Sequence, residues 1–260
     1  MGKRKLIDQL SESRLLRYVM LHVQNVLQPK VETRLTDGTS PKLATKYEYY
    51  VMEVFQSLTR IINTVESLEY ILLFLKRLPP KDFFRRHEFT KAKYFQYQIE
   101  NHLIRVSTIY DQMILLANAA FQLGIQEKKC NEDLIVNNKH TKGTDSIKCL
   151  KECKKGIVGV ITARNLIVHR GEFDDSDLEK LDTYTFIARF TDLENTENRA
   201  EAFLSKGFVE QLSKSVQQNK IQLIEKNNIA VVKILLKYFR SLETPIGDTI
   251  IALHPDKIKT

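Results

Sequence analysis

The stretch "VFQSLTRIINTVESLEYILLFL", Val54 to Leu75, contains the clearest structural pattern in the chain. Its aliphatic residues recur at alternating spacings of four and three, and they are Val54, Leu58, Ile61, Val65, Leu68, Leu72 and Leu75. This spacing places one apolar stripe along a helix, as in a coiled-coil seam. It predicts a helix over residues 44–77, about 50 Å long at the standard rise per residue. Pro79 and Pro80 end it.

Further helices are expected on the C-terminal side of this one. The apolar residues of 90–123 share one face, and Gly124 follows them as a stop signal. The next helix begins near Asp145 and ends at Gly171, after a polar, lysine-rich segment, 126–145, that we predict to be a loop. The acidic string "DDSDLEKL" predicts another helix N-terminus. A last long helix is expected over 197–241, closed by Pro245 and Gly247.

The N-terminal region predicts a separate helix. It covers residues 3–28 and ends at Pro29, before the turn-forming string "TRLTDGTSP". No strand periodicity and no internal repeat is visible, so the fold class is all-α. We expect an elongated up-and-down bundle of four to five long helices with an additional N-terminal helix. The expected division is 1–43 for the N-terminal helix and loop, 44–242 for the bundle and 243–260 for a short tail.

Composition narrows the class of protein and of partner. The chain has 260 residues, 43% of them hydrophobic, with nine glycines and six prolines, which is typical of one globular, helix-rich domain. The net charge of +8 is compatible with a polyanion partner or with solvated basic helix faces. The stretch Lys76 to Lys93 carries seven bases and two acids, so the positive charge is concentrated there.

The cysteine content and the N-terminal residues indicate the cellular compartment of the protein and whether it needs a cofactor. Three cysteines are an odd number, which favours reduced thiols in a cytosol over a disulfide framework. Cys149 and Cys153 share a helix face but have no obvious second pair of ligands, so no metal and no other cofactor is expected. The first residues lack a signal-peptide core, and no apolar run reaches membrane-spanning length. We expect a soluble, cytoplasmic protein without a membrane partner.

The helix expected at 145–170 carries an unusual polar group near its end, in the string "ITARNLIVHRGEF". Arg164 continues an apolar series that includes Leu150, Ile157, Ile161 and Val168, in which Lys154 also falls. A buried guanidinium is costly unless it is paired. Arg164 is therefore either an ion-pair partner of a facing carboxylate or part of an anion pocket, because its planar donors suit phosphate.

Asn165 and His169 follow on the same helix, four residues apart and on one face. His169 lies five residues beyond Arg164, so the two side chains diverge by about 140° on one straight helix. They act on one substrate only if the helix breaks near His169 or if a second chain contributes. The alternative for His169 is a favourable interaction with the negative end of the helix dipole.

The string "RNLIVH", Arg164 to His169, resembles the R-x4-H signature of the HEPN superfamily (higher eukaryotes and prokaryotes nucleotide-binding). The long stretch "YQIENHLIRVSTIYDQMILLANAAFQLG", Tyr97 to Gly124, is similar to the helix that precedes the signature in a group of stand-alone, largely uncharacterised prokaryotic HEPN proteins. The region from the first of these pieces to the end of the second spans about a third of the chain. The resemblance implies an all-helical bundle and a homodimer in which two copies of the signature face each other.

The resemblance also implies metal-independent cleavage of RNA by its own 2′-hydroxyl. Arg164 would hold the scissile phosphate, His169 would act as general acid or base, and Asn165 would orient either of them. One departure concerns HEPN toxins paired with a nucleotidyltransferase, which often carry a tyrosine two residues after the histidine. Gly171 occupies that position here, so modification of such a tyrosine is not expected.

Other side chains are weaker candidates for substrate binding. They are Arg170, Lys154, Lys155, Arg105 and Glu100. Glu100 and Arg105 fit a helix-surface ion pair as well, and solvated lysines are common. The aromatic residues Tyr94, Phe95 and Tyr97, next to the basic stretch, would either stack on nucleotides or belong to the core.

Three functions remain open from the sequence. The first is a HEPN-type endoribonuclease that binds RNA, with a toxin, defence or housekeeping role and a protein regulator or antitoxin as further partners. The second is a catalytically silent HEPN-like protein that binds RNA or a nucleotide. The third is a helical protein-interaction module in which Arg164 only forms a structural pair.

Overall fold

The computed structural model describes residues 5–37, 43, 45–193 and 206–254. Every element of regular structure in these ranges is helical, which confirms the all-α class. In chain order the elements are α1 (Leu6–Ser11), α2 (Arg14–Asp37), α3 (Lys46–Lys76), α4 (Lys81–Arg86), α5 (Lys91–Ala120), η1 (Glu127–Lys129), α6 (Glu132–Val136), α7 (Asp145–Arg170), α8 (Ser176–Leu193) and α9 (Lys206–Leu253). Among the described residues no helix combines the length and the apolar character that a membrane crossing needs.

The chain divides into two compact units, and several helices continue from one unit into the other. Unit 1 comprises residues 1–66, 107–158 and 229–260. Unit 2 comprises residues 67–106 and 159–228.

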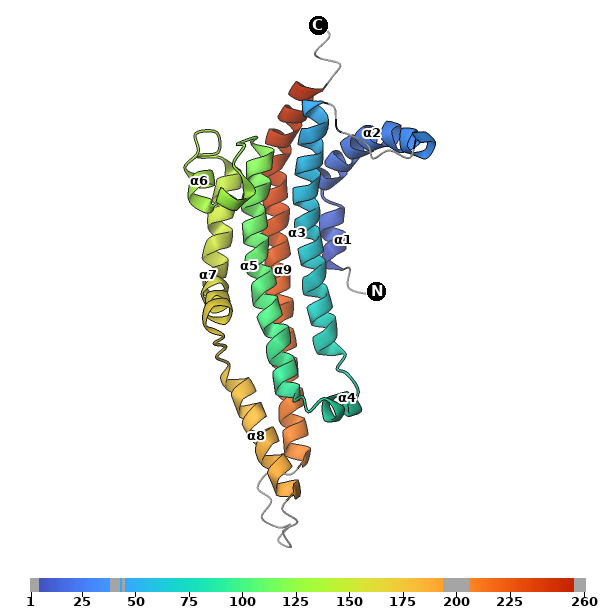
Figure 1. Ribbon diagram of the computed structural model, residues 1–260. Coiled ribbons are helices and arrows are strands. Elements are labelled where there is room, and N and C mark those ends of the chain that lie inside the picture. Colours follow the sequence, from blue (N-terminus) through green and yellow to red (C-terminus); the bar gives the residue numbers. More distant parts are fainter. Residues whose placement is uncertain (1–4, 38–42, 44, 194–205, 255–260) are drawn as a thin grey trace. The chain divides into compact units, whose positions relative to one another are not determined.

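In unit 1, segments of α3, α5, α7 and α9 lie alongside one another (Figure 1). The Tyr50 hydroxyl donates to the Ala120 carbonyl at 3.0 Å, and Gln112 donates to Thr64 at 2.9 Å. Because the early part of α3 meets the late part of α5, these two helices are antiparallel. The Tyr238 hydroxyl of α9, fully buried, donates to the Met113 carbonyl of α5 at 2.7 Å.

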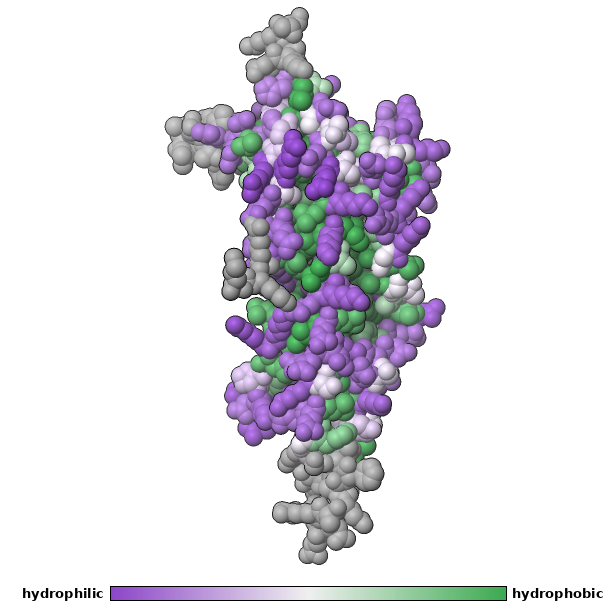
Figure 2. Space-filling model, turned by 180° about the vertical axis from the view of Figure 1, so that it is seen from behind, coloured by the Kyte–Doolittle hydropathy of each residue, from purple (hydrophilic) through white to green (hydrophobic). Residues whose placement is uncertain are grey.

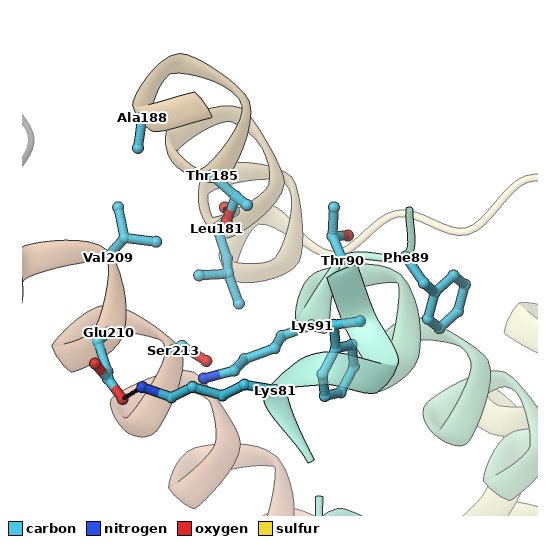
Figure 3. Close-up of a pocket in the computed structure, with 11 residues that line it drawn as sticks. Lys81, Phe89, Thr90, Lys91, Leu181, Thr185, Ala188, Val209, Glu210 and Ser213 are labelled. Atoms are coloured by element: carbon cyan, nitrogen blue, oxygen red, sulfur yellow. Dashed lines mark hydrogen bonds and ion pairs between the residues drawn. The ribbon is translucent and has the colours of Figure 1, made fainter. Parts of the chain in front are cut away.

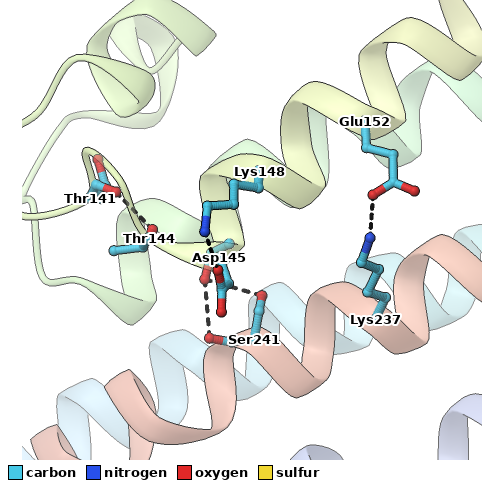
Figure 4. A network of polar contacts seen from close by, with 8 residues as sticks. Thr141, Thr144, Asp145, Lys148, Glu152, Lys237 and Ser241 are labelled. Atoms are coloured by element: carbon cyan, nitrogen blue, oxygen red, sulfur yellow. Dashed lines mark hydrogen bonds and ion pairs between the residues drawn. The ribbon is translucent and has the colours of Figure 1, made fainter.

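Polar contacts join the first half of α7 to the last part of α9 within unit 1 (Figure 4). The Ser146 hydroxyl donates to the Ser241 carbonyl at 3.2 Å, and Lys237 forms an ion pair with Glu152. The two contacts are six residues apart on α7 and four residues apart on α9, and their order shows that α7 and α9 are antiparallel. The up-and-down arrangement is therefore confirmed by contacts between successive long helices.

Unit 2 contains the end of α3, α4, the start of α5, the end of α7, α8 and the first part of α9. Gln217 of α9 donates to the Leu75 carbonyl of α3 at 2.6 Å, and Lys76 pairs with Glu225. The core holds aliphatic and aromatic side chains from all of these segments except the end of α7. They include Leu68, Leu75, Phe84, Phe95, Leu178, Leu181, Val216 and Ile224.

The apolar stripe of α3 forms as the spacing predicts, with one exception. Six of the seven residues named from the sequence are buried, but Leu72 is only half-buried. Ile71 is buried in its place, with 6% of its surface exposed. A step of three residues and a step of four residues both stay on one helix face, so Ile71 and Leu72 both lie near the apolar stripe. The residues that pack against α3 decide which of the two is buried.

Two prolines do not end helices as we expected. Residues after Pro29 continue α2 to Asp37, so the N-terminal helix is longer than predicted, and it is divided from α1 at Glu12 and Ser13. Pro245 lies inside α9. A proline inside a helix costs about 3 kcal/mol, but Ile246 and Ile250 beyond it are buried and compensate for this loss.

Other boundaries differ by short elements. The segment 126–145 is not a plain loop, because η1 and α6 lie within it and Asn131 caps α6 by accepting a hydrogen bond from the Leu134 N–H at 3.0 Å. Helix α4, which follows Pro80, was not predicted from the sequence. Residues 197–205 of the expected last helix, residues 38–42 and 44, and residues 255–260 of the expected tail lie outside the described ranges.

Candidate functional site

The end of α7 carries the candidate site, and the helix is continuous through it. All residues from Arg164 to Arg170 are helical, so α7 has no break between Arg164 and His169 and ends one residue beyond His169. The helix ends at Gly171, whose φ of +67° lies in the left-handed region that favours glycine. The Gly171 N–H donates to the Ile167 carbonyl at 3.0 Å, which keeps the last turn regular.

Arg164 is half-buried and has no ion-pair partner among the described residues. One of its terminal N–H groups, on Nη1, donates to the Asn165 side-chain oxygen at 3.1 Å. The Nε atom is buried and has no hydrogen-bond partner. The structure therefore does not support the predicted alternative of a structural ion pair with a facing carboxylate. A buried donor of a charged group without an acceptor is costly, so an acceptor from outside the described chain would stabilise it.

His169 and Asn165 are exposed. Because the helix is continuous between Arg164 and His169, their side chains leave its axis about 140° apart. One copy of the chain therefore does not direct both side chains at one phosphate. Asn165, by contrast, is held next to Arg164 by the hydrogen bond between them.

The predicted apolar seam of α7 is correct only for its first half. Leu150 and Ile157 are buried, together with Cys149 and Cys153, but Lys154 is exposed. No residue of α7 from position 158 to its end is buried. The prediction that Ile161, Arg164 and Val168 continue a buried stripe was therefore wrong for this chain by itself, because Ile161 and Arg164 are only half-buried and Val168 is exposed.

Two apolar side chains within the motif are exposed to solvent. Leu166 is 37% exposed and Val168 is 51% exposed. Exposed apolar residues also occur elsewhere, and hydrophobic side chains show between hydrophilic ones in several places on the face drawn in Figure 2. Exposure alone does not single out α7. The end of α7 differs because three features lie on two successive turns. They are the exposed apolar residues, the buried Arg164 Nε donor without an acceptor, and the exposed His169.

The weaker candidates are spread over the chain. Glu100 accepts a hydrogen bond from Gln96 at 2.8 Å, and Arg105 is exposed. Within the described ranges neither forms an ion pair or a hydrogen bond with the other or with Arg164, so the predicted surface pair between them is absent. Lys154 pairs with Glu132 at 2.6 Å in unit 1, while Lys155 and Arg170 are exposed.

A buried lysine that the sequence did not indicate fixes the segment after the motif. Lys220 of α9 is 9% exposed, and its ammonium lies 2.8 Å from the Asp175 carboxylate and 3.2 Å from that of Asp177. Burial alone would lower the pKa of Lys220, but the hydrogen bonds to both aspartates outweigh it and raise the pKa. The acidic string after Gly171 is thus held to α9, which anchors the chain immediately beyond the candidate site.

An aromatic surface near the basic stretch is partly exposed, contrary to the view that these rings all belong to the core. Phe95 is buried, but Tyr97 is 59% exposed and Phe74 is 48% exposed. The Tyr94 hydroxyl donates to the Phe74 carbonyl at 3.3 Å, which joins the end of α3 to the start of α5. We use the name basic aromatic face for four exposed residues, which are Phe74 of α3, Arg77 directly after α3, and Lys93 and Tyr97 of α5, the helix that this hydrogen bond joins to α3. Both cations are exposed and form no ion pair with a described residue.

Metal-binding residue types do not gather in the described part of the chain, where no group of three or more His, Cys, Asp or Glu side chains is placed to hold an ion. The three cysteines are free thiols. Burial raises the pKa of Cys153 to about 12, as expected for an inert buried thiol.

Comparison with known protein families gave a match over most of the bundle. A profile of Cthe2314-like HEPN proteins matches residues 50–220, which is more than half of the chain and includes Arg164, Asn165 and His169. A search of the curated proteins and a search of the solved structures gave no match.

Proposed function

Since the chain belongs to the Cthe2314-like HEPN family, whose wider superfamily often cleaves RNA, we propose that it is a metal-independent endoribonuclease. The proposed active site is composite. Arg164 and Asn165 of one chain combine with His169 of a second copy across a two-fold axis. This arrangement resolves the divergence of the two side chains on one continuous helix.

The observation that carries the proposal is the state of Arg164. Its Nε donor is buried without a partner, and its Nη1 donor is oriented by Asn165 and not by a carboxylate. A phosphate oxygen is an acceptor that matches the planar fork of a guanidinium. An arginine reserved for a phosphate would show this combination of partial burial and missing acceptor.

The reaction that we propose needs only the RNA and these side chains. Neutral His169 removes the proton from the 2′-hydroxyl, whose oxygen attacks the adjacent phosphorus. The bond from phosphorus to the 5′-oxygen breaks, and that oxygen receives a proton from a histidinium or from water. A 2′,3′-cyclic phosphate and a free 5′-hydroxyl result. Arg164 stabilises the negative charge that develops on the phosphoryl oxygens.

A dimer interface at the end of α7 is part of the proposal. Leu166 and Val168 lie within the motif and are exposed, so a second copy would bury them together with the helix face around Arg164. HEPN proteins commonly dimerise, which agrees with this role for the exposed residues.

The basic aromatic face supports RNA as the substrate. Tyr97 and Phe74 expose rings on which bases can stack, and Arg77 and Lys93 supply cations that form no ion pair with a described residue. A contact of this kind is largely independent of base sequence. We propose that it holds a single-stranded part of the RNA while another part reaches the composite site.

The test uses purified protein, a mixed-sequence RNA and excess EDTA. We expect cleavage that leaves cyclic phosphate ends, and a loss of at least ~100-fold in rate for His169→Ala or Arg164→Ala. His140→Ala is the control, because His140 is an exposed histidine outside the site. Equal cleavage by wild-type and His169→Ala protein would sink the assignment. RNA binding without cleavage by the wild type would favour a silent HEPN protein.

Mixing two inactive variants tests whether the site is composite. A heterodimer of Arg164→Ala and His169→Ala chains contains one intact site if the residues come from different chains. With random exchange of chains, about a quarter of the wild-type activity should return. No recovery, in a mixture whose chain exchange is verified by mass spectrometry, would show that both residues act within one chain.

A further inference from the structure

A cavity in unit 2 is not explained by the proposed function. It has a volume of about 280 Å³ and lies between α4, the start of α5, α8 and the start of α9. The walls come from segments that are far apart in the sequence but close in the fold (Figure 3). None of Arg164, Asn165 and His169 lines it.

One side of the cavity is apolar. Leu181 and Ala188 of α8 and Val209 of α9 project into the same space (Figure 3), and Phe84 contributes from α4. Thr90 and Thr185 also line the cavity, but their hydroxyl groups are already used as donors. Thr90 donates to Asp182 at 2.8 Å, and Thr185 donates to the Leu181 carbonyl at 2.6 Å. This side therefore favours an apolar group over one that needs hydrogen bonds.

The other side of the cavity is cationic. Lys81 and Lys91 extend their ammonium groups toward Glu210 (Figure 3), and Lys81 lies 3.5 Å from its carboxylate. Lys81, then Lys91 and Lys214, lower the pKa of Glu210, so this carboxylate is surrounded by more positive than negative charge. Lys91 has no ion-pair partner among the described residues, which leaves one ammonium available to a ligand.

We propose that this cavity binds a small amphipathic anion, with a carboxylate or phosphate head next to Lys91 and Lys81 and an apolar body of roughly six to eight carbons against Leu181, Ala188 and Val209. The site does not depend on the ribonuclease proposal, because it shares no residue with the composite site. A fatty-acid-like carboxylate and an alkyl phosphate have the same recognition chemistry.

Isothermal titration calorimetry with hexanoate, octanoate, octyl phosphate and octylammonium tests the proposal on the full chain. We expect saturable binding of octanoate and octyl phosphate, and an affinity that rises about fourfold for each methylene from hexanoate to octanoate. A larger affinity for octyl phosphate than for octanoate would identify a phosphate ester as the source of the head group. Octylammonium should not bind, because its charge is repelled by Lys81 and Lys91. Equal binding of octylammonium, or no saturable binding of either anion, would overturn the proposal.

Four substitutions, one of them a control outside the cavity, locate the ligand. Lys91→Gln should weaken octanoate binding by about three- to fivefold, while Lys180→Gln, which removes an exposed charge of α8 outside the cavity, should leave it unchanged. Ala188→Phe should fill the apolar side and reduce octanoate affinity at least ~10-fold. Val209→Phe serves the same purpose if Ala188→Phe does not fold, as judged by circular dichroism. Unchanged octanoate affinity in Lys91→Gln and in a folded pocket-filling variant would show that the anion binds elsewhere.

Discussion

The Arg164 guanidinium donates a hydrogen bond to the side-chain oxygen of its neighbour Asn165 at 3.1 Å, and not to a carboxylate. The R-x4-H pattern allows Arg164 either a structural or a substrate-binding role, and its hydrogen-bond partner distinguishes the two. An arginine that stabilises the fold has an acidic partner, whereas an arginine kept for a substrate has donors without acceptors. The buried, unpartnered Nε places Arg164 closer to the second role.

Replacing Arg164 by leucine should raise stability while it abolishes cleavage. The change removes a partly buried, incompletely bonded cation, so we expect the free energy of unfolding to increase by about 1 kcal/mol. Urea denaturation followed by circular dichroism measures it. A decrease of about 2 kcal/mol or more would instead indicate a structural arginine. Arg164→Lys tests geometry, since it keeps the charge but loses the planar fork, and RNA cleavage should fall at least ~100-fold.

Charged substitutions at the end of α7 should dissociate the proposed dimer. Leu166→Glu and Val168→Glu each place a carboxylate where a second copy would be buried, and two copies of it would face each other across the axis. Sedimentation velocity should show monomers together with loss of cleavage. Leu223→Glu is the matched control, because Leu223 is an equally exposed aliphatic residue of α9, at 52%. If all three variants sediment as the wild type does, the interface lies elsewhere.

A buried histidine should make the stability of the fold depend on pH. His102 is 1% exposed, neither ring nitrogen has a hydrogen-bond partner, and burial lowers its pKa from 6.5 to about 4. Between pH 6.5 and pH 4 the unfolded chain takes up a proton that the folded chain does not, so stability falls as the pH falls through this window. The full effect of this group is about 3 kcal/mol.

The variant His102→Leu should remove that dependence and gain about 2 kcal/mol over the wild type at pH 5. Urea titrations at several pH values between 4.5 and 7.5 provide the measurement. His140→Gln, at an exposed position, should retain the wild-type profile. A wild-type profile that is flat between pH 4.5 and pH 6.5 would contradict the role of His102.

The ion pair between Lys220 and Asp175 should contribute more to the free energy of unfolding than the ion pair between Lys220 and Asp177. Asp175 lies in a largely enclosed pair, with side-chain exposures of 11% for Lys220 and 17% for Asp175, whereas the Asp177 side chain is 50% exposed. We expect Asp175→Asn to lower the free energy of unfolding by about 2 kcal/mol and Asp177→Asn by less than about 1 kcal/mol. Equal effects of the two changes in thermal or urea unfolding would argue against the buried pair as an anchor.

Two glycines of the same region should respond to alanine in opposite directions. Gly171 has a φ of +67°, so Gly171→Ala should destabilise the protein by about 1 kcal/mol although nothing lies within 4 Å of the added methyl group. Gly159 is inside α7 and has the same open surroundings, so Gly159→Ala should stabilise it by about 0.5–1 kcal/mol. A shift of the melting temperature in the same direction for both variants would show that backbone conformation is not the cause.

The long helices, the stop at Gly171 and the R-x4-H motif followed from the sequence alone. Each of these depends on local properties: the side-chain period of a helix, the left-handed conformation that glycine allows, and the order of residues along one turn. The stripe from Val54 to Leu75 therefore appears in the structure almost as its spacing predicts, with Ile71 in place of Leu72.

Burial and partners were decided by the tertiary structure, because they depend on residues that are distant in sequence. Helix α9 continues past Pro245 because Ile246 and Ile250 beyond it are buried. The apolar seam of α7 is buried only as far as Ile157. Only the three-dimensional arrangement shows that Arg164 has no carboxylate partner among the described residues and that Lys81, Lys91 and Leu181 line one cavity. The sequence determines which helices form and where the motif lies, and the packing of those helices determines which side chains are left to bind something else.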